Sequence, residues 1–178
     1  LSNKFISRII RKINQKKIKI GIATDDISRL DFFIEKNIDF YKVLSKDINN
    51  VDLINKIISS NKRIFLSTGK ADYRTIKHLL GKISQSDKIR LIHTSFDSAL
   101  EGAKLERIEK LKNIFKIPIS YGNHSPYLMN IPLSIIFNPE YIFTYVKLDN
   151  TKNYPDDNHA ITIDMIDEIL YSVKQIIK

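Results

Sequence analysis

The sequence predicts an α/β fold in which helices cover a parallel β-sheet. Short apolar runs rich in Ile, Val, Phe and Tyr recur along the chain, and stretches with helical spacing of apolar residues lie between them. The two kinds of segment alternate with a period of roughly 22 to 28 residues. Such alternation is typical of β-α units, whose parallel strands are joined by crossover helices.

Six apolar runs are expected to form strands. Arg63–Ser67 and Ile89–His93 are apolar over most of their length, as is usual in parallel strands that are buried under helices. The six predicted strands are Ile18–Ala23, Phe40–Leu44, Arg63–Ser67, Ile89–His93, Ile117–Tyr121 and Tyr141–Val146.

An amphipathic helix is expected before the first strand, and a further helix after each strand. Asn50, Asp72 and Thr162 stand just ahead of periodic apolar residues, where they would cap helices, and Pro139 follows the fifth inter-strand helix. The helices predicted after the strands are Ile27–Ile34, Val51–Ile58, Tyr73–Ile83, Leu105–Ile114, Tyr127–Ile136 and Thr162–Ile177.

Six β-α units without a Pro-rich or Ser-rich linker predict one structural unit, and two architectures suit them. One is an open doubly wound sheet, and the other is six consecutive eighths of a (β/α)8 TIM-type barrel that lacks its first two units. The chain begins with Leu1 and not with Met, which favours the partial barrel, units 3 to 8.

The composition is that of a globular protein and excludes several classes. The 178 residues include no cysteine, so a disulfide scaffold, a thiolate metal site and a cysteine nucleophile are excluded, and a cytoplasmic location is expected. No apolar run approaches the roughly 18 to 20 residues that a membrane span needs, so no membrane partner is expected.

The net charge of +9 comes mostly from the start of the chain. Seven cations precede the first acidic residue, Asp25. They lie on an amphipathic segment that could bind nucleic acid or an anionic membrane surface, but a solvated outer helix is the favoured interpretation. Because no aromatic interleaving accompanies the charge, no nucleic-acid partner is expected. The seven cations are Lys4, Arg8, Arg11, Lys12, Lys16, Lys17 and Lys19.

Polar side chains gather at the carboxyl ends of the predicted strands, where α/β proteins place their sites. Hydroxyls and loop amides together with an inward lysine suit a phosphate or carboxylate ligand. These strand-end residues are Thr24, Lys42, Ser45, Thr68, Gly69 and Thr94.

Two of the four histidines are candidates for chemistry. His124 directly follows a strand, which suits metal ligation or acid–base work, and His159 lies in an acidic loop that could reach the same site. His78 is expected on a helix surface, whereas His93 is either a packed residue or a pocket residue. Since no HxH, HExxH or paired-carboxylate motif occurs, the spacing alone predicts no self-sufficient metal site.

Five blocks at and around these strand ends resemble the sialic acid synthase family in order and spacing. That family condenses phosphoenolpyruvate with an N-acetylmannosamine-type sugar. The resemblance extends from about residue 18 to the end of the chain. The blocks are Asp39–Asp47, Ile64–Gly69, Leu100–Leu105, Ile117–His124 and Leu148–Asp149 followed by Asn158–Thr162.

The resemblance implies the fold and partners of a nonulosonic acid synthase. Residues 1–178 would be a partial N-acetylneuraminate synthase-like barrel domain, with the family's C-terminal antifreeze-like domain absent. The partners would be phosphoenolpyruvate and an N-acetylated hexose, with a divalent metal, Mn or Mg, as cofactor and a possible homodimer as the assembly.

The resemblance also implies roles for particular residues. Phosphoenolpyruvate would be held by Thr24, Lys42, Ser45, Thr68, Gly69 and Thr94. Asp47 falls where the family keeps an acidic residue near the sugar carbonyl, and His159 is the second candidate catalytic residue. His124 falls on one of the two histidines that hold the metal, which would polarise the sugar carbonyl.

The chain departs from the family pattern at several of these predicted strand ends. In the last strand the family shows Glu-x-His-x-Thr-Leu-Asp, and Tyr145 occupies the position of the second metal histidine. Gly122 replaces a serine, Thr94 an asparagine and Asn158 an aspartate. Two hypotheses therefore remain: an active synthase, or a catalytically impaired family member that serves as a binding or scaffold protein in surface carbohydrate biosynthesis.

Overall fold

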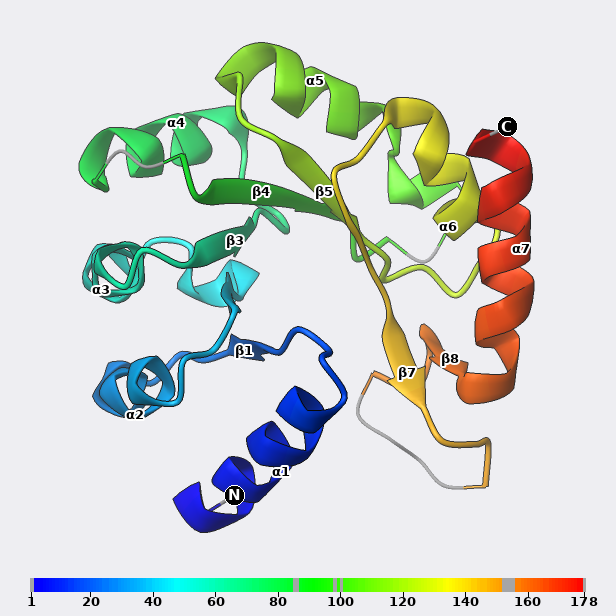
Figure 1. The fold of residues 1–178 in the computed structure, drawn as a ribbon. Coiled ribbons are helices and arrows are strands. Elements are labelled where there is room, and N and C mark those ends of the chain that lie inside the picture. The colour runs from blue at the N-terminus through cyan, green and yellow to red at the C-terminus, as the bar shows by residue number, and fades with distance from the viewer. Residues whose placement is uncertain (1, 85–86, 98, 100, 152–155, 178) are drawn as a thin grey trace. The chain divides into compact units, whose positions relative to one another are not determined.

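The computed structural model describes residues 2–84, 87–97, 99, 101–151 and 156–177 (Figure 1). The chain divides into two compact units. Unit 1 comprises Leu1–Ser67 and Asp72–Arg90, and unit 2 comprises Thr68–Ala71 and Leu91–Lys178. Leu1, at the start of the chain, and Leu100, in one of the five family-like blocks, lie outside the described residues.

Unit 1 is built from three parallel strands and the helices that connect them. The strands follow the chain order, with Gly21 opposite Phe40 and Phe40 opposite Arg63. The predicted strands and helices of this part of the chain are confirmed apart from shifts at their ends, except that the helix predicted over Ile27–Ile34 is divided into a 3-10 helix and an α-helix. The elements are α1 Asn3–Gln15, β1 Gly21–Ala23, η1 Ile27–Arg29, α2 Leu30–Glu35, β2 Phe40–Val43, η2 Ser45–Asp47, α3 Val51–Ser59, β3 Arg63–Ser67 and α4 Tyr73–Lys82.

The core of unit 1 lies between its strands and its helices. Tyr41 and Val43 share one face of β2, and both are fully buried, as are Leu53 and Ile57 of α3. Figure 1 shows α2 and α3 on the same side of β1, β2 and β3. The strand alternation therefore leaves Lys42, which is half-buried, on the face of β2 turned away from the core side chains.

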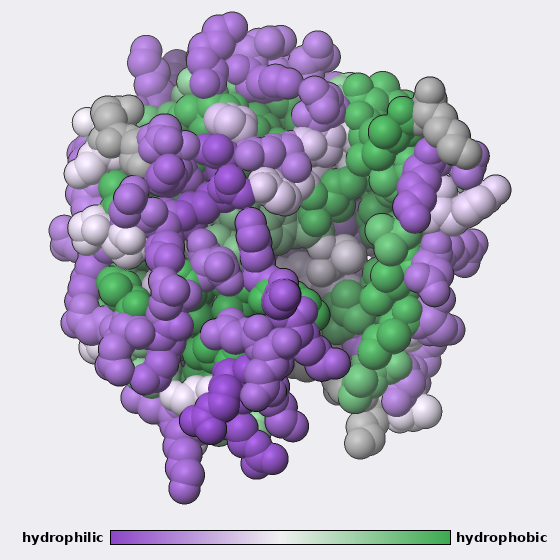
Figure 2. All heavy atoms as spheres, in the orientation of Figure 1, coloured by the Kyte–Doolittle hydropathy of each residue, from purple (hydrophilic) through white to green (hydrophobic). Residues whose placement is uncertain are grey.

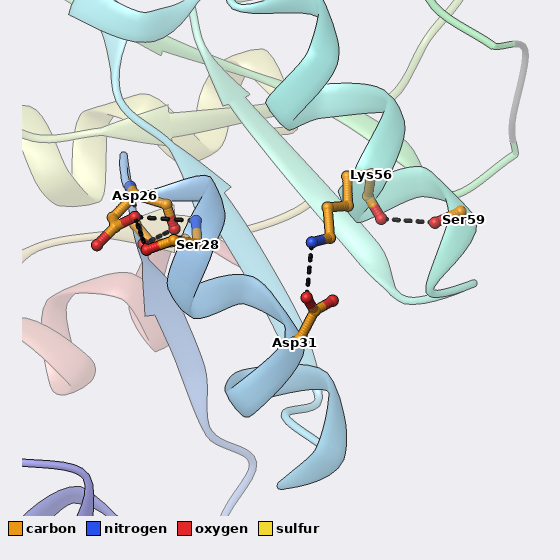
Figure 3. Close-up of polar contacts among 6 residues, drawn as sticks. Asp26, Ser28, Asp31, Lys56 and Ser59 are labelled. Carbon is orange, nitrogen blue, oxygen red and sulfur yellow. Dashed lines mark hydrogen bonds and ion pairs between the residues drawn. The ribbon is translucent and has the colours of Figure 1, made fainter.

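Short-range polar contacts fix the connections in unit 1 (Figure 3). The Asp26 carboxylate accepts hydrogen bonds from the backbone N–H and the hydroxyl of Ser28, at 2.9 and 2.6 Å, and so begins η1. Lys56 Nζ of α3 pairs with Asp31 Oδ2 of α2 at 2.9 Å, while the Ser59 hydroxyl donates to the Lys56 carbonyl at 2.7 Å. Of these contacts, the Lys56–Asp31 ion pair links the consecutive helices α2 and α3.

Two of the three predicted helix caps form. The side chain of Asn50 accepts from Leu53 N at 3.1 Å and that of Asp72 accepts from Thr75 N at 2.7 Å. Thr162 occupies the cap position of a 3-10 turn, but its side chain makes no capping hydrogen bond. Thr162 has an extended backbone and is the last residue of strand β8.

Loss of the Asn50 cap is expected to destabilise the protein measurably. Asn50→Ala removes the only side-chain acceptor that the described residues offer to Leu53 N, so the free energy of unfolding should fall by about 1 kcal/mol. Urea unfolding of this variant and of Asn49→Ala, its exposed neighbour, is the matched measurement. An equal loss in both variants would contradict the capping role.

Unit 2 contains the later strands and two parallel sheets. Strands β4, β5 and β6 follow the chain order, with Leu91 opposite Ile119 and Tyr121 opposite Ile142. Its elements are β4 Ile89–Thr94 from Leu91 onwards, η3 Glu101–Ala103, α5 Glu106–Phe115, β5 Ile119–Gly122, α6 Asn130–Leu133, η4 Ser134–Phe137, β6 Ile142–Phe143, β7 Tyr145–Lys147, β8 Ala160–Thr162, η5 Ile163–Met165 and α7 Ile166–Ile177.

The end of the chain differs from the sequence prediction in its strand pairing. The single strand predicted for Tyr141–Val146 is two strands, because β6 pairs with β5 whereas β7 pairs with β8. The apolar run continues across the break and so gives no sign of the change of partner. The helix predicted over Tyr127–Ile136 is also divided, into α6 and the 3-10 helix η4, and α6 contains Pro132, which has no N–H to donate.

Unit 2 also exposes apolar side chains on its last helices. Figure 2 shows hydrophobic residues gathered along α7 and over the neighbouring α6. Of the exposed apolar residues in this unit, Ile136 of η4 is 68% exposed and Ile177 of α7 is 66% exposed. No helix among the described residues combines the length and apolar character needed to cross a bilayer.

Candidate functional site at the strand ends

The predicted site residues fall into two groups that belong to different units. Thr24, Lys42, Ser45 and Asp47 lie in unit 1. The others lie in unit 2, and they are Thr68, Gly69, Thr94, His124, Tyr145 and His159.

In unit 1 the predicted residues follow two adjacent strands. Lys42 of β2 pairs in register with Ala23 of β1, so Thr24 comes directly after the same strand end. Thr24 is buried, and its Oγ1 accepts a hydrogen bond from Asp26 N at 3.3 Å. Asp47 Oδ2 is buried and has no hydrogen-bond partner among the described residues, which leaves it able to accept one from a ligand.

An exposed ion pair stands beside these residues. Lys46 Nζ lies 2.5 Å from Asp25 Oδ2 and 4.0 Å from Asp47 Oδ2. The hydrogen bond from Lys46 is the main reason that the pKa of Asp25 lies below its usual value, and the same bond raises the pKa of Lys46. Both groups are in solvent, so the pair orients the loop more than it stabilises the fold.

In unit 2 the segment after β3 is tied to β4 by three hydrogen bonds. Thr68 N and Thr68 Oγ1 both donate to the Ile92 carbonyl, at 2.9 and 3.0 Å, and Gly69 N donates to Thr94 Oγ1 at 3.1 Å. Thr68 and Thr94 are buried. Because the Thr94 oxygen accepts from Gly69, its hydroxyl proton remains available to donate to an anionic ligand.

Two departures from the family pattern prove to be structurally coupled. Gly122 pairs in register with Thr94, and a Cβ built on Gly122 would lie 2.5 Å from Thr94 Cγ2 and 3.0 Å from Ile92 Cγ2. The threonine methyl thus fills the space that a serine at position 122 would need. The glycine at position 122 and the threonine at position 94 are therefore compatible with each other in this register.

The rings of His124, Tyr145 and His159 form one cluster that lies just after β5 and at the starts of β7 and β8. The ring centroids of His124 and His159 are 4.7 Å apart, those of His124 and Tyr145 5.1 Å, and those of Tyr145 and His159 4.8 Å. Phe96, which the sequence did not point to, packs edge-on against His124 at 4.8 Å. The structure thus brings His159 beside His124, as its loop position had suggested. We call these four residues the ring cluster.

Burial shifts the pKa values of two members of the ring cluster, Tyr145 and His159. It raises the pKa of Tyr145, to which the Asp156 carboxylate adds, so the phenol stays protonated at neutral pH. Burial also lowers the pKa of His159, against the smaller opposing effect of Asp156. His159 Nε2 lies 3.7 Å from Asp156 Oδ1 and has no hydrogen-bond partner among the described residues.

An ion pair beside the ring cluster was also missed from the sequence. Lys147 Nζ, on the same strand as Tyr145, lies 2.7 Å from Asp157 Oδ1, and its side chain is only 10% exposed. Asp157 belongs to the loop that carries His159, so the pair fastens this loop to β7. The two-residue spacing from Tyr145 was the available signal, because residues two apart share a strand face.

His93 is a packed residue and not part of the site. It is fully buried, its Nε2 lies 2.8 Å from the Ala103 carbonyl, and its ring lies near that of Tyr121. Burial lowers the pKa of His93 to about 4. His78 is exposed on α4, as predicted.

The ring cluster does not fit the divalent metal that the resemblance implies. One of the two expected imidazole ligands is the neutral phenol of Tyr145, which is a poor ligand for such an ion. In the part of the chain that the structure describes, no group of three or more His, Asp or Glu side chains could hold a metal ion. His124 alone remains of the predicted ligand pair.

The fold defines the class: an α/β protein of parallel β-α units, with polar side chains next to strands in each of its two units. The family model described as "NeuB family" matches residues 1–178. The chain belongs to the NeuB family.

Similar proteins agree with this assignment. The chain is 24% identical over 174 residues to N,N'-diacetyllegionaminic acid synthase of Campylobacter jejuni, covering 93% of this chain and 52% of that protein. It is 28% identical over 155 residues to an uncharacterised protein of Methanocaldococcus jannaschii, covering 82% of this chain and 45% of that protein. The chain therefore spans about half the length of these curated relatives.

A solved structure confirms the fold class. The N-acetylneuraminic acid (sialic acid) synthetase of Leptospira borgpetersenii, solved in complex with citrate, matches with a TM-score of 0.89 at 22% identity, covering 99% of this chain and 63% of that one. The predicted α/β fold with TIM-type β-α units is thus confirmed, and the sialic acid synthase resemblance agrees with the family.

Proposed function

We propose that this protein acts in nonulosonic acid biosynthesis by condensing phosphoenolpyruvate with an N-acetylated hexose such as N-acetylmannosamine. A bond would form between C3 of phosphoenolpyruvate and the carbonyl carbon of the open-chain sugar, water would add at C2, and inorganic phosphate would leave. The observation that carries the proposal is the family match over residues 1–178, which includes the strand ends of both units.

The residues of unit 2 suit the binding of phosphoenolpyruvate. The Thr94 hydroxyl, fixed by the hydrogen bond from Gly69 N, is a buried donor for a phosphate or carboxylate oxygen. In unit 1 the roles follow the same logic: Thr24, Lys42 and Ser45 bind the anion, and Asp47 Oδ2 accepts a proton or a hydrogen bond from the sugar. His159 is the second candidate for proton transfer.

Phosphate release tests the proposal. Purified protein is incubated with phosphoenolpyruvate and N-acetylmannosamine, inorganic phosphate is followed, and the nine-carbon or related product is detected by mass spectrometry. Thr94→Val should weaken phosphoenolpyruvate binding about tenfold or more, because a buried donor to a charged group is lost. Thr75→Val makes the same change on α4 and should leave binding unchanged.

A second candidate is binding without turnover, as in a scaffold protein of surface carbohydrate biosynthesis. Tyr145 in place of a histidine specifically favours it. Calorimetric binding of phosphoenolpyruvate, with no release of its phosphate in the presence of any N-acetylated hexose, would support this candidate and overturn the first. Failure to bind phosphoenolpyruvate by a folded protein would overturn both.

A further inference from the structure

Two departures from the family pattern face the same way on β7. The pattern Glu-x-His-x-Thr-Leu-Asp places a histidine where this chain has Tyr145 and a threonine where it has Lys147. Side chains two residues apart on a strand lie on one face, with their Cα atoms about 7 Å apart. Tyr145 in place of histidine removes a ligand for a cation. Lys147 in place of threonine adds a positive charge on the same strand face.

The added charge is fixed in place. The Lys147 side chain is only 10% exposed, and its Nζ contacts both the carboxylate of Asp157, at 2.7 Å, and the Asp157 carbonyl, at 3.4 Å. Its strand neighbour in register is Thr162 of β8. The Asp157 carboxylate offsets part of this charge, but the ammonium still lies on the strand face of Tyr145 and disfavours a divalent cation beside it.

The donors near His124 point to the same conclusion. His124 is packed by the rings of Phe96, Tyr145 and His159, of which only His159 offers a nitrogen ligand. Mn²⁺ and Mg²⁺ favour carboxylate oxygens. The Asp157 carboxylate is already bonded to the Lys147 ammonium. The Asp156 carboxylate lies 3.7 Å from His159 Nε2, but among the described residues no group of three or more His, Asp or Glu side chains could hold a metal ion.

We infer that this chain holds no divalent cation beside His124 and Tyr145, and that the Lys147 ammonium, two residues further along β7, is the fixed positive charge on that strand face instead. The inference goes beyond the proposed function, since it concerns cation binding in the absence of any substrate. It also explains the residues at positions 145 and 147 together: the chain would have exchanged a bound metal ion for the positive charge of a lysine side chain.

Mn²⁺ binding to the substrate-free protein tests the inference. Titration followed by electron paramagnetic resonance should show no saturable site in the wild-type protein at millimolar Mn²⁺. Tyr145→His restores a ligand and should give weak binding. The double variant Tyr145→His/Lys147→Thr should bind about tenfold more tightly than Tyr145→His, because the like charge is removed as well. The matched control, Tyr145→His/Lys77→Thr, removes an exposed lysine of α4 and should equal Tyr145→His.

Two results would overturn the inference. One is a saturable wild-type Mn²⁺ site that His124→Gln abolishes, since the ion would then be present. The other is a double variant that keeps its circular dichroism spectrum and melting temperature yet gains no Mn²⁺ site, since Lys147 would then not stand in a cation's place. Phosphate release is not measured in either case, so these failures are distinct from failure of the proposed function.

Discussion

Ile108→Ala is expected to lower the free energy of unfolding by about 2 to 5 kcal/mol. Ile108 lies on α5 and is fully buried. Truncation at such a site loses the transfer free energy of the removed carbons and leaves a cavity that the surrounding side chains fill only in part.

The same helix provides a matched control for this prediction. Ile114 also lies on α5 but is 53% exposed, so Ile114→Ala deletes the same atoms from a place already in contact with water. Its cost should stay within about 1 kcal/mol. Urea unfolding curves of the two variants measure the difference, and equal midpoints would show that α5 does not pack as described.

Acidification between about pH 6.5 and pH 4 is expected to remove roughly 3 kcal/mol of stability through His93 alone. Burial holds the pKa of this residue in the folded protein at about 4, against an ordinary value of 6.5 in the unfolded chain. Within that interval the unfolded chain binds a proton that the folded protein does not, so falling pH favours unfolding. Above the interval both states are neutral at His93, and below it both are protonated, so the loss stops growing.

Urea unfolding at pH 7 and at pH 4.5 checks this expectation. His93→Gln keeps a donor for the Ala103 carbonyl and removes the titrating group, so the difference in unfolding free energy between the two pH values should shrink. His78→Gln replaces an exposed histidine and should leave that difference unchanged. An undiminished difference in His93→Gln would assign the acid sensitivity to other groups.

Most strands and helices could be predicted from the sequence because they depend on local patterns of apolar residues. Arg63–Ser67 was predicted with the boundaries that β3 has, and Ile89–His93 ends one residue before β4 does. Both are buried apolar runs between helices, and that pattern requires no knowledge of distant residues. β8 was not predicted because Ala160–Thr162 follows an acidic, Asn-containing loop and is not part of a longer apolar run.

The site was less predictable because its parts meet through non-local pairing. His124 could be selected from its position after a strand, but the partners around it depend on the pairing of β7 with β8 and on the loop that joins them. Phe96 lies far away in sequence and carries no chemistry of its own. The compatibility of Gly122 with Thr94 likewise appears only when the register of β4 and β5 is known. The roles assigned to Asp47 and His159 remain predictions.

The separate sheet of β7 and β8 has a consequence for local unfolding. Tyr145 lies on one of these strands, and His159 directly precedes the other. Since the two strands pair with each other and not with β6, they can open as a small cooperative unit at a lower free energy than the whole protein requires. Backbone amides of β7 and β8 would then exchange with solvent together and ahead of those in β4 and β5. Such an opening separates the two rings while the larger sheet stays intact.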